Sequence, residues 1–169
     1  MKLLLVRHAI AEEAESFIAA GGADAQRPLT EVGRKKMRKG ANRLRSQLGS
    51  IDTLACSPLL RARETAEIIA RAFGDPPIVE RPELDYSQPP EAVVRWLAQG
   101  PPEAVVVAVG HEPQLSFLTG LLLAGIARPL VIFRKGGVAL LECPGRVRAG
   151  EGVLHWVLTP NQLRSLKQE

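Results

Sequence analysis

Two apolar runs that no polar residue interrupts constrain the fold of this chain more than any other feature. Residues 3–6 read Leu-Leu-Leu-Val, and residues 105–109 read Val-Val-Val-Ala-Val. Strands that are buried on both faces have this pattern, and they occur in parallel sheets that helices cover on both sides. We therefore expect an α/β fold: a three-layer α/β/α sandwich with a mostly parallel central sheet, in a single domain spanning residues 1–169.

Strand and helix patterns alternate along the rest of the chain. The first strand is expected at residues 2–6, and further strands are expected at residues 54–55, 105–109, 137–142 and 155–158. Helices are expected at residues 30–48, from Pro58 to about residue 74, and at residues 90–99 and 113–124. Loops are expected at residues 9–28 and 74–85. The first helix begins after Thr30, a suitable capping residue, and its expected buried stripe is Val32, Met37, Ala41, Leu44 and Leu48.

Basic residues and histidines follow the ends of the apolar runs. Arg7 and His8 follow the first run, and His111 follows the run at 105–109. Arg61 lies at the start of the helix that follows a third short run. In an open α/β sheet, the carboxyl ends of the strands form the edge where ligands bind. Arginine at that edge indicates an anionic ligand, because its planar guanidinium group can bind phosphate through two parallel hydrogen bonds.

Three segments of the chain resemble the signature segments of a known enzyme family. They are Arg7-His8-Ala9, residues 57–65 with the sequence Ser-Pro-Leu-Leu-Arg-Ala-Arg-Glu-Thr, and Gly110-His111-Glu112-Pro113. In this order they resemble the histidine phosphatase superfamily, which has the phosphoglycerate mutase-like fold. Residues 27–33, Arg-Pro-Leu-Thr-Glu-Val-Gly, and residues 135–138, Lys-Gly-Gly-Val, narrow the resemblance to the SixA-like phosphohistidine phosphatase branch. The resemblance extends from residue 1 to about residue 166.

The resemblance implies a reaction in which His8 becomes transiently phosphorylated. A histidine can attack phosphorus only as a neutral ring with one free nitrogen, so we expect a backbone carbonyl to hold its other N–H. His111 is expected to act as a cation or as a proton donor to a phosphoryl oxygen. Protein cations would surround the phosphoryl group, so no metal and no other cofactor is expected. The resemblance assigns catalytic roles to His8, Arg7, Arg61 and His111, and a substrate-binding role to Arg27. Ser57 and Lys135 are further candidates for binding substrate.

Simpler roles stand beside some of these assignments. Ser57 could instead cap the following helix, and Lys135 could be a solvated surface residue. Arg63 lies two positions beyond Arg61, so on a helix it points about 200° away and is expected at the surface. His155 lies in an expected strand outside the matching segments, where we expect a structural role.

The proton donor distinguishes between substrate classes. Phosphoglycerate mutase-like relatives carry a glutamate in a Gly-rich, Trp-containing context, of which Pro82-Glu83-Leu84-Asp85 keeps only the acid. An alkoxide must be protonated as it departs, whereas an imidazole protonated at its second nitrogen leaves readily. The sequence therefore favours phosphohistidine on a signalling or phosphotransfer protein as the substrate. The alternatives are a phosphatase or mutase acting on a small phosphorylated metabolite, and a non-catalytic phosphate-binding regulatory module.

Composition bears on the partners and the location of the protein. The net charge of +4 and the pI of about 9.4 favour anionic ligands, but only 4% of the residues are aromatic, so no nucleic-acid partner is expected. The apolar run after Lys2 is too short for a signal peptide or a membrane span, and we expect a cytoplasmic protein without membrane contact. Cys56 and Cys143 lack metal-ligand spacing and are expected to be buried and reduced. We expect a monomer or a dimer whose partner is a phosphohistidine-bearing protein or a small phosphorylated molecule.

Overall fold

The computed structural model of the chain describes residues 1–167. Within these residues, six strands form one sheet in the order β3-β2-β4-β1-β5-β6. The strands are β1 (Lys2–Arg7), β2 (Thr53–Cys56), β3 (Ile78–Glu80), β4 (Val105–Gly110), β5 (Val138–Glu142) and β6 (Val153–Leu158). The four strands from β3 to β1 are parallel. β5 pairs antiparallel with β1, and β6 pairs antiparallel with β5. The mostly parallel sheet that the apolar runs predict is confirmed.

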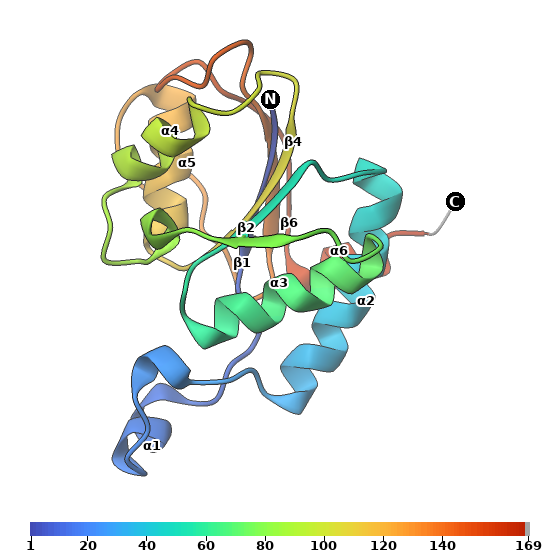
Figure 1. Cartoon of the computed structure of the whole chain (residues 1–169), viewed down its shortest axis with the longest axis vertical. Coiled ribbons are helices and arrows are strands. Elements are labelled where there is room, and N and C mark those ends of the chain that lie inside the picture. The colour runs from blue at the N-terminus through green and yellow to red at the C-terminus, as the bar shows by residue number, and fades with distance from the viewer. Residues whose placement is uncertain (168–169) are drawn as a thin grey trace.

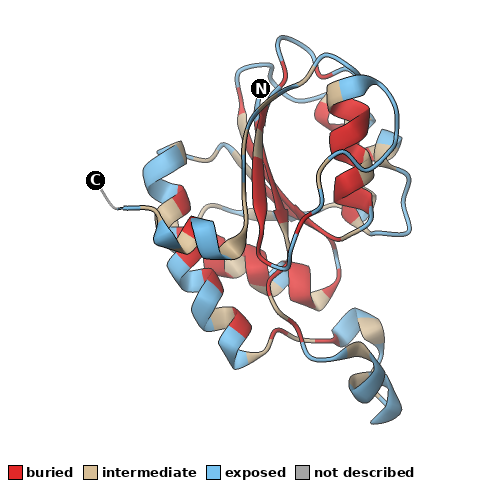
Figure 2. Ribbon diagram, turned by 180° about the vertical axis from the view of Figure 1, so that it is seen from behind, coloured by how far each residue is buried: buried red, intermediate tan, exposed pale blue. Residues whose placement is uncertain are grey.

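Helices cover both faces of the sheet and give the molecule three layers (Figure 1). One face carries α2 (Glu31–Leu48), α3 (Leu60–Ala72) and α6 (Pro160–Ser165), and the other carries α4 (Pro90–Leu97) and α5 (Gln114–Ala124). Leu3 and Leu5 of β1 pack in the core beneath α4 and α5, whereas Leu4 and Val6 pack in the core beneath α2 and α3. Buried residues accordingly fill the sheet and the inner sides of the helices (Figure 2). Burial on both faces explains why β1 has no polar residue between Lys2 and Arg7.

The segment between β1 and α2 differs from the plain loop that was expected. It contains the helix α1 (Ala14–Ala19) and the short 3-10 helix η1 (Asp24–Gln26), and α1 projects from the body of the molecule (Figure 1). An antiparallel bridge between Ala11 and Leu29 closes the base of this segment. We call residues 11–29 the arm. None of the α1 residues is buried, so the apolar pattern carried no signal for this helix.

Three other expectations need correction. Residues 78–80 form the edge strand β3 inside the expected loop, followed by the 3-10 helix η2 (Pro82–Leu84), and α6 was not predicted. Val32 was expected in the buried stripe of α2, but it is 56% exposed. The buried face of α2 lies away from Val32, because this face includes Gly33 and Gly40 as well as Met37. The predicted cap is confirmed, since the Thr30 side chain accepts a hydrogen bond from the Gly33 amide at 3.0 Å.

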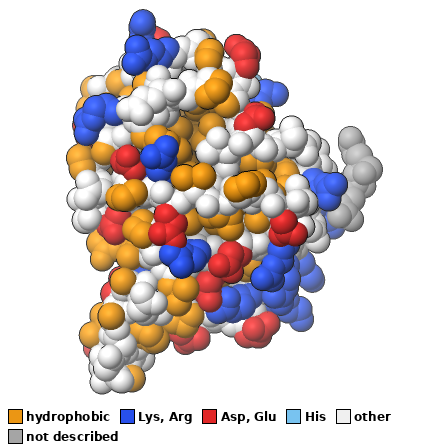
Figure 3. All heavy atoms as spheres, viewed as in Figure 1, with side chains coloured by type: hydrophobic (Ala, Val, Ile, Leu, Met, Phe, Trp, Pro, Cys, Tyr) orange, Lys and Arg blue, Asp and Glu red, His pale blue; other side chains and the backbone are white. Residues whose placement is uncertain are grey.

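Charged side chains of both signs share the surface over α2 and α3 (Figure 3). The lysines of α2 are exposed, as the sequence indicated, and Arg38 forms an ion pair with Glu31 at 3.3 Å. Both cysteines are free and buried, also as expected. Among the helices of residues 1–167, none combines the length and the apolar character that crossing a membrane requires.

Candidate active site

Three parallel strands end at the same level, and this brings His8, Ser57 and His111 together. In the pairing of β1 with β4, Arg7 lies opposite Gly110, and in the pairing of β2 with β4, Cys56 lies opposite Val109. His8, His111 and Ser57 are the residues that directly follow β1, β4 and β2. The His8 amide donates to the Gly110 carbonyl and the Ser57 amide donates to the Val109 carbonyl, both at 3.0 Å. A cavity of about 510 Å³ opens at this edge, between the strand ends and the arm.

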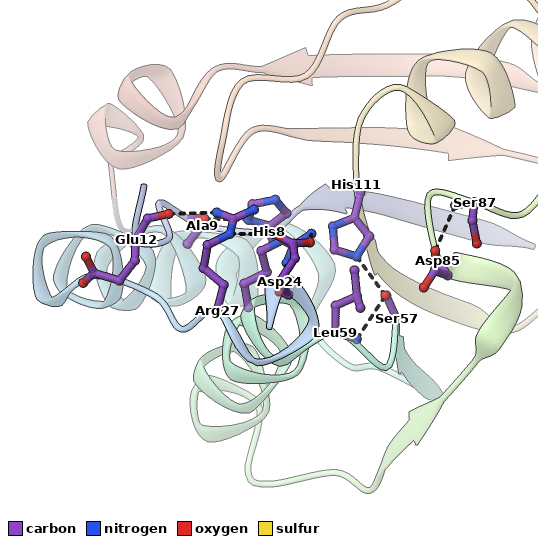
Figure 4. A network of polar contacts seen from close by, with 11 residues as sticks. His8, Ala9, Glu12, Asp24, Arg27, Ser57, Leu59, Asp85, Ser87 and His111 are labelled. Carbon is purple, nitrogen blue, oxygen red and sulfur yellow. Dashed lines mark hydrogen bonds and ion pairs between the residues drawn. The ribbon is translucent and has the colours of Figure 1, made fainter. Parts of the chain in front are cut away.

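His8 is held in one tautomer. Its Nδ1 lies 2.7 Å from the Ala9 carbonyl oxygen (Figure 4), which can only accept, so Nδ1 carries the proton and Nε2 keeps its lone pair. This carbonyl is the backbone acceptor that the sequence predicted. The Ala9 peptide is fixed in turn, because its amide donates to the Thr65 hydroxyl at 3.0 Å. Burial, together with the neighbouring His111 and Arg61, lowers the pKa of His8 to about 2. His8 is therefore neutral at physiological pH.

His111 takes the same tautomer as His8, with its ring proton on Nδ1, and Ser57 is the reason. The Ser57 hydroxyl oxygen lies 2.8 Å from Nε2 of His111 and accepts a hydrogen bond from the Leu59 amide at 3.3 Å (Figure 4). The hydroxyl oxygen could accept a second hydrogen bond, but the described residues offer the Ser57 proton no other acceptor, so we infer that this proton is donated to Nε2. Nδ1 of His111 then carries the ring proton, and this buried atom has no hydrogen-bond partner in the structure. The arrangement leaves an N–H group free for a ligand.

The charge of His111 depends on whether the cavity holds an anion. Burial, together with the Arg61 cation, lowers the pKa of His111 to about 3. The ring is therefore neutral when the cavity holds no anion, and it offers an N–H donor rather than a positive charge. A bound anion would raise this pKa, because a nearby negative charge favours the protonated ring.

Two arginines of the site are tied to one carboxylate. Arg61, in the first turn of α3, contacts the Asp24 carboxylate through Nη2 at 3.1 Å and donates from Nη1 to the Asp24 carbonyl at 2.9 Å. Arg27 contacts the other Asp24 oxygen through Nε at 2.8 Å. Burial opposes ionisation of Asp24, but the two arginines outweigh burial and hold the pKa of its carboxyl below the usual value. Asp24 is therefore an anion that contacts Arg27 within the arm (Figure 4) and links the arm to Arg61 of α3.

Arg7 is anchored on the other side of the cavity. Its Nη1 donates to the Phe133 carbonyl at 2.7 Å, and the Phe133 amide donates to the Glu112 carboxylate at 2.6 Å. Nε of Arg7 and Nε of Arg61 are both buried without a hydrogen-bond partner, like Nδ1 of His111. Three N–H donors of cavity-lining residues thus lack an acceptor. Buried donors are normally satisfied, and these three belong to residues that line one cavity, so the cavity favours an anionic ligand over a cationic one.

The residues predicted to bind substrate divide into two groups. Arg27 and Lys135 line the cavity. Ser57 is fully buried and does not line it, so the prediction of a direct substrate contact needs correction: its hydroxyl contacts His111 and the amide that follows in α3. Arg63 is exposed and pairs with Glu80, and His155 lies on β6 with Nε2 at 2.8 Å from Glu142, both outside the cavity as expected.

Several cavity residues were missed from the sequence. Asp24 carried one usable signal, because it lies three residues before Arg27, the spacing at which side chains meet on a helical turn. The Tyr86 ring contacts the His111 ring edge-on, with 5.6 Å between the ring centroids. Nothing in the sequence around Tyr86 indicated this contact. Glu83, the residue left from the acid segment, is not among the cavity-lining residues. Within residues 1–167 no three His, Cys, Asp or Glu side chains are grouped so as to hold a metal ion.

Comparisons with known proteins point to one family. The sequence model of one family, the histidine phosphatase superfamily (branch 1), matches residues 3–86. An uncharacterized protein of Picosynechococcus sp. is 33% identical in an alignment 145 positions long that covers 82% of each chain. The phosphohistidine phosphatase SixA of Escherichia coli is 29% identical in an alignment 170 positions long that covers 99% of each chain.

Solved structures agree with the sequence comparisons. The structure of the protein histidine phosphatase SixA complexed with tungstate superposes with a TM-score of 0.82 and 27% identity, covering 96% of this chain and 99% of that one. Phosphoserine phosphatase from Entamoeba histolytica in complex with 3-phosphoglyceric acid has a TM-score of 0.68 at 18% identity, with 96% and 98% of the two chains covered. The second likeness extends to the fold alone.

Proposed function

Because the chain belongs to the SixA-like branch of the histidine phosphatase superfamily, we propose that it hydrolyses phosphohistidine on a protein through a phosphorylated His8, without a metal ion. The observation that supports this best is the orientation of the His8 ring. Its Nδ1–H is held by the Ala9 carbonyl at 2.7 Å, which leaves the Nε2 lone pair for attack on phosphorus. Arg7, Arg61 and His111, whose three N–H donors have no partner within the protein, line the same cavity as this histidine.

These groups suit a phosphoryl group in transfer. The transferred group carries its charge on three equatorial oxygens, and catalysis consists mainly of positioning and of stabilising that charge. Nε of Arg7, Nε of Arg61 and Nδ1 of His111 give three donors for three oxygens. Because the donors are already in place and buried, they need little rearrangement when charge redistributes in the transition state. The guanidinium groups provide the positive charge that a metal ion provides in other phosphatases.

The proposed reaction has two steps. In the first, His8 Nε2 forms a bond to phosphorus while the bond to the substrate nitrogen breaks, and the substrate leaves as neutral imidazole because its other ring nitrogen is protonated. In the second, the oxygen of a water molecule forms a bond to phosphorus while the bond to Nε2 breaks. One water proton passes to a phosphoryl oxygen, so that dihydrogen phosphate is released and His8 returns to its neutral form. Neither step needs a strong acid at the leaving group, which fits the absence of Glu83 from the cavity lining.

A direct competition between substrates tests this proposal. Purified protein is given a phosphohistidine peptide, a phosphoserine peptide and 3-phosphoglycerate under identical conditions, with and without a chelator, and phosphate release is measured. We expect the phosphohistidine peptide to be hydrolysed fastest, at a rate that the chelator does not change. Faster release from either ester would overturn the substrate assignment. A chelated rate that one divalent ion restores would overturn the metal-independent mechanism.

A further inference from the structure

A second, smaller cavity lies beside the active site, between α2, α6 and the turn that precedes β5. Its volume is about 70 Å³, and its walls include Ile10, Met37, Pro160 and Leu163. Met37 and Leu163 are buried, so the cavity reaches into the apolar packing between the two helices. We call it the α2–α6 cavity. Apolar walls of this kind favour an aliphatic group as the occupant.

The rim of the α2–α6 cavity is positively charged. Lys36 of α2, Lys135 of the turn and Arg164 of α6 line it, and none of the lining residues is acidic. Arg164 is oriented by a hydrogen bond to the side chain of Asn161. Three cations around an apolar opening favour an occupant whose aliphatic side chain is flanked by carboxylates.

Position connects this cavity to the catalytic one. Lys135 lines both cavities, and Ala9, the residue after His8, lines the α2–α6 cavity. A protein substrate whose phosphoryl group lies at His8 would therefore also cover the rim of the α2–α6 cavity.

Size decides between a free small molecule and a protein segment. Cavities that enclose a free ligand usually measure roughly 300–1,000 Å³. A cavity of 70 Å³ holds several water molecules, or one aliphatic side chain, as the anchor pockets of protein interfaces do. Resting on the proposed function, we propose that the α2–α6 cavity receives an aliphatic side chain, next to acidic residues, from the phosphoprotein substrate.

Two phosphohistidine peptides that differ only in their flanking residues test this inference. One carries Leu and Glu on both sides of the phosphohistidine, and the other carries Leu and Lys. For each peptide, kcat/KM is divided by the kcat/KM of phosphoramidate. We expect this ratio to be at least about tenfold higher for the acidic peptide than for the basic one. In Lys36→Glu and Arg164→Glu most of this preference is lost.

Lys39→Glu is the matched control, because Lys39 is an exposed residue of the same helix outside both cavities. We expect this variant to keep the preference. Equal ratios for the two peptides in the unmodified protein, or an equal loss in Lys36→Glu and Lys39→Glu, would overturn the inference. If phosphoramidate and both peptides resist hydrolysis, the proposed function fails instead. Fluorescence anisotropy with the unphosphorylated peptides then still decides whether the cavity prefers the acidic one, and no preference there overturns the inference.

Discussion

Ser57 acts on the active site through His111 rather than through the ligand. Leu59 N–H, the Ser57 hydroxyl and His111 Nε2 form a chain in which each group donates to the next. The chain ends by placing the ring proton on Nδ1, the atom that faces no protein acceptor. A neutral histidine with the other tautomer would present a lone pair to a phosphoryl oxygen, which is repulsive. We therefore regard Ser57 as a positioning residue.

Substitution of Ser57 tests this role. In Ser57→Ala the hydroxyl is lost, so we expect His111 to populate both tautomers and kcat to fall by about tenfold or more, because one donor to the transition state becomes unreliable. The ¹⁵N chemical shifts of the His111 ring report the tautomer directly. Ser57→Thr keeps the hydroxyl and should restore both the tautomer and most of the rate. Unaltered His111 shifts in Ser57→Ala would contradict the assignment, whatever the rate.

Arg61 and Arg63 are close in sequence but differ in environment. Arg61 is buried at the cavity and Arg63 is exposed next to Glu80. Arg61→Ala should lower kcat by on the order of 10² or more, since a buried charge-assisted donor is removed, and Arg61→Lys should recover only part of this loss. Arg63→Ala, the matched control, should stay within a few-fold of the unmodified protein. A larger loss for Arg63→Ala at equal folded yield would show that the wrong arginine has been assigned.

At the scale of elements, the loop after β1 and the start of α2 are joined by a close contact at Gly33. A Cβ atom at this position would lie 2.1 Å from the Ile10 carbonyl oxygen, which itself accepts from the Thr30 amide at 2.9 Å. Gly33→Ala should therefore lower the free energy of unfolding by about 1–3 kcal/mol, because the helix must move away from the loop. Gly100→Ala, whose Cβ would meet its nearest atoms at 3.4 Å, should cost less. Equal denaturation midpoints for the two variants would contradict this account of the contact.

Elements with a strong burial pattern could be predicted from the sequence, and weakly buried ones could not. β1 is apolar from Leu3 to Val6, and β4 is apolar from Val105 to Val109, because both faces of these strands are covered. β3 has three residues, none of them buried, and α6 buries only Leu163, so neither leaves a readable pattern. Val32 was misplaced because glycine residues, which count as neither apolar nor polar in such a pattern, form part of the buried face of α2.

The candidate site divides in the same way. His8, His111 and the arginines could be predicted because they follow strands whose ends align at one edge of a parallel sheet. Asp24 could not be placed there, because it reaches Arg61 only through the fold of the arm, which no apolar pattern records. The Ser57 contact was also out of reach of the sequence, since it depends on the register between β2 and β4.

At the scale of the whole molecule, the two buried histidines make stability depend on pH. The pKa values of His8 and His111, about 2 and about 3, lie below the value of roughly 6.5 expected in the unfolded chain. Between these values the unfolded state binds more protons, so the free energy of unfolding falls as pH drops below about 6.5, by up to about 1.4 kcal/mol per pH unit for each histidine. Above about pH 6.5 both histidines are neutral in the folded and in the unfolded state, so they no longer make the free energy of unfolding depend on pH.

Chemical denaturation between pH 7 and pH 4.5 measures this effect, in a range where most carboxylates keep their charge. His111→Gln removes one of the two histidines, so its free energy of unfolding should fall less steeply with decreasing pH than that of the unmodified protein. Equal slopes for the two proteins would contradict the assignment of a neutral, buried His111. Added phosphate should also flatten the slope of the unmodified protein, because a bound anion raises the pKa values of the histidines.

The proposed reaction requires His8 to be the nucleophile, so the phosphorylated protein should carry its phosphoryl group on this residue and can be trapped. The protein is mixed with a ³²P-labelled phosphohistidine peptide and quenched within milliseconds in denaturant, and the labelled residue is identified by mass spectrometry. We predict an acid-labile, base-stable phosphoryl group on His8, and none in His8→Ala. Label on a serine or on Cys56, whose pKa burial raises to about 11, would contradict the account. So would rapid turnover by His8→Ala.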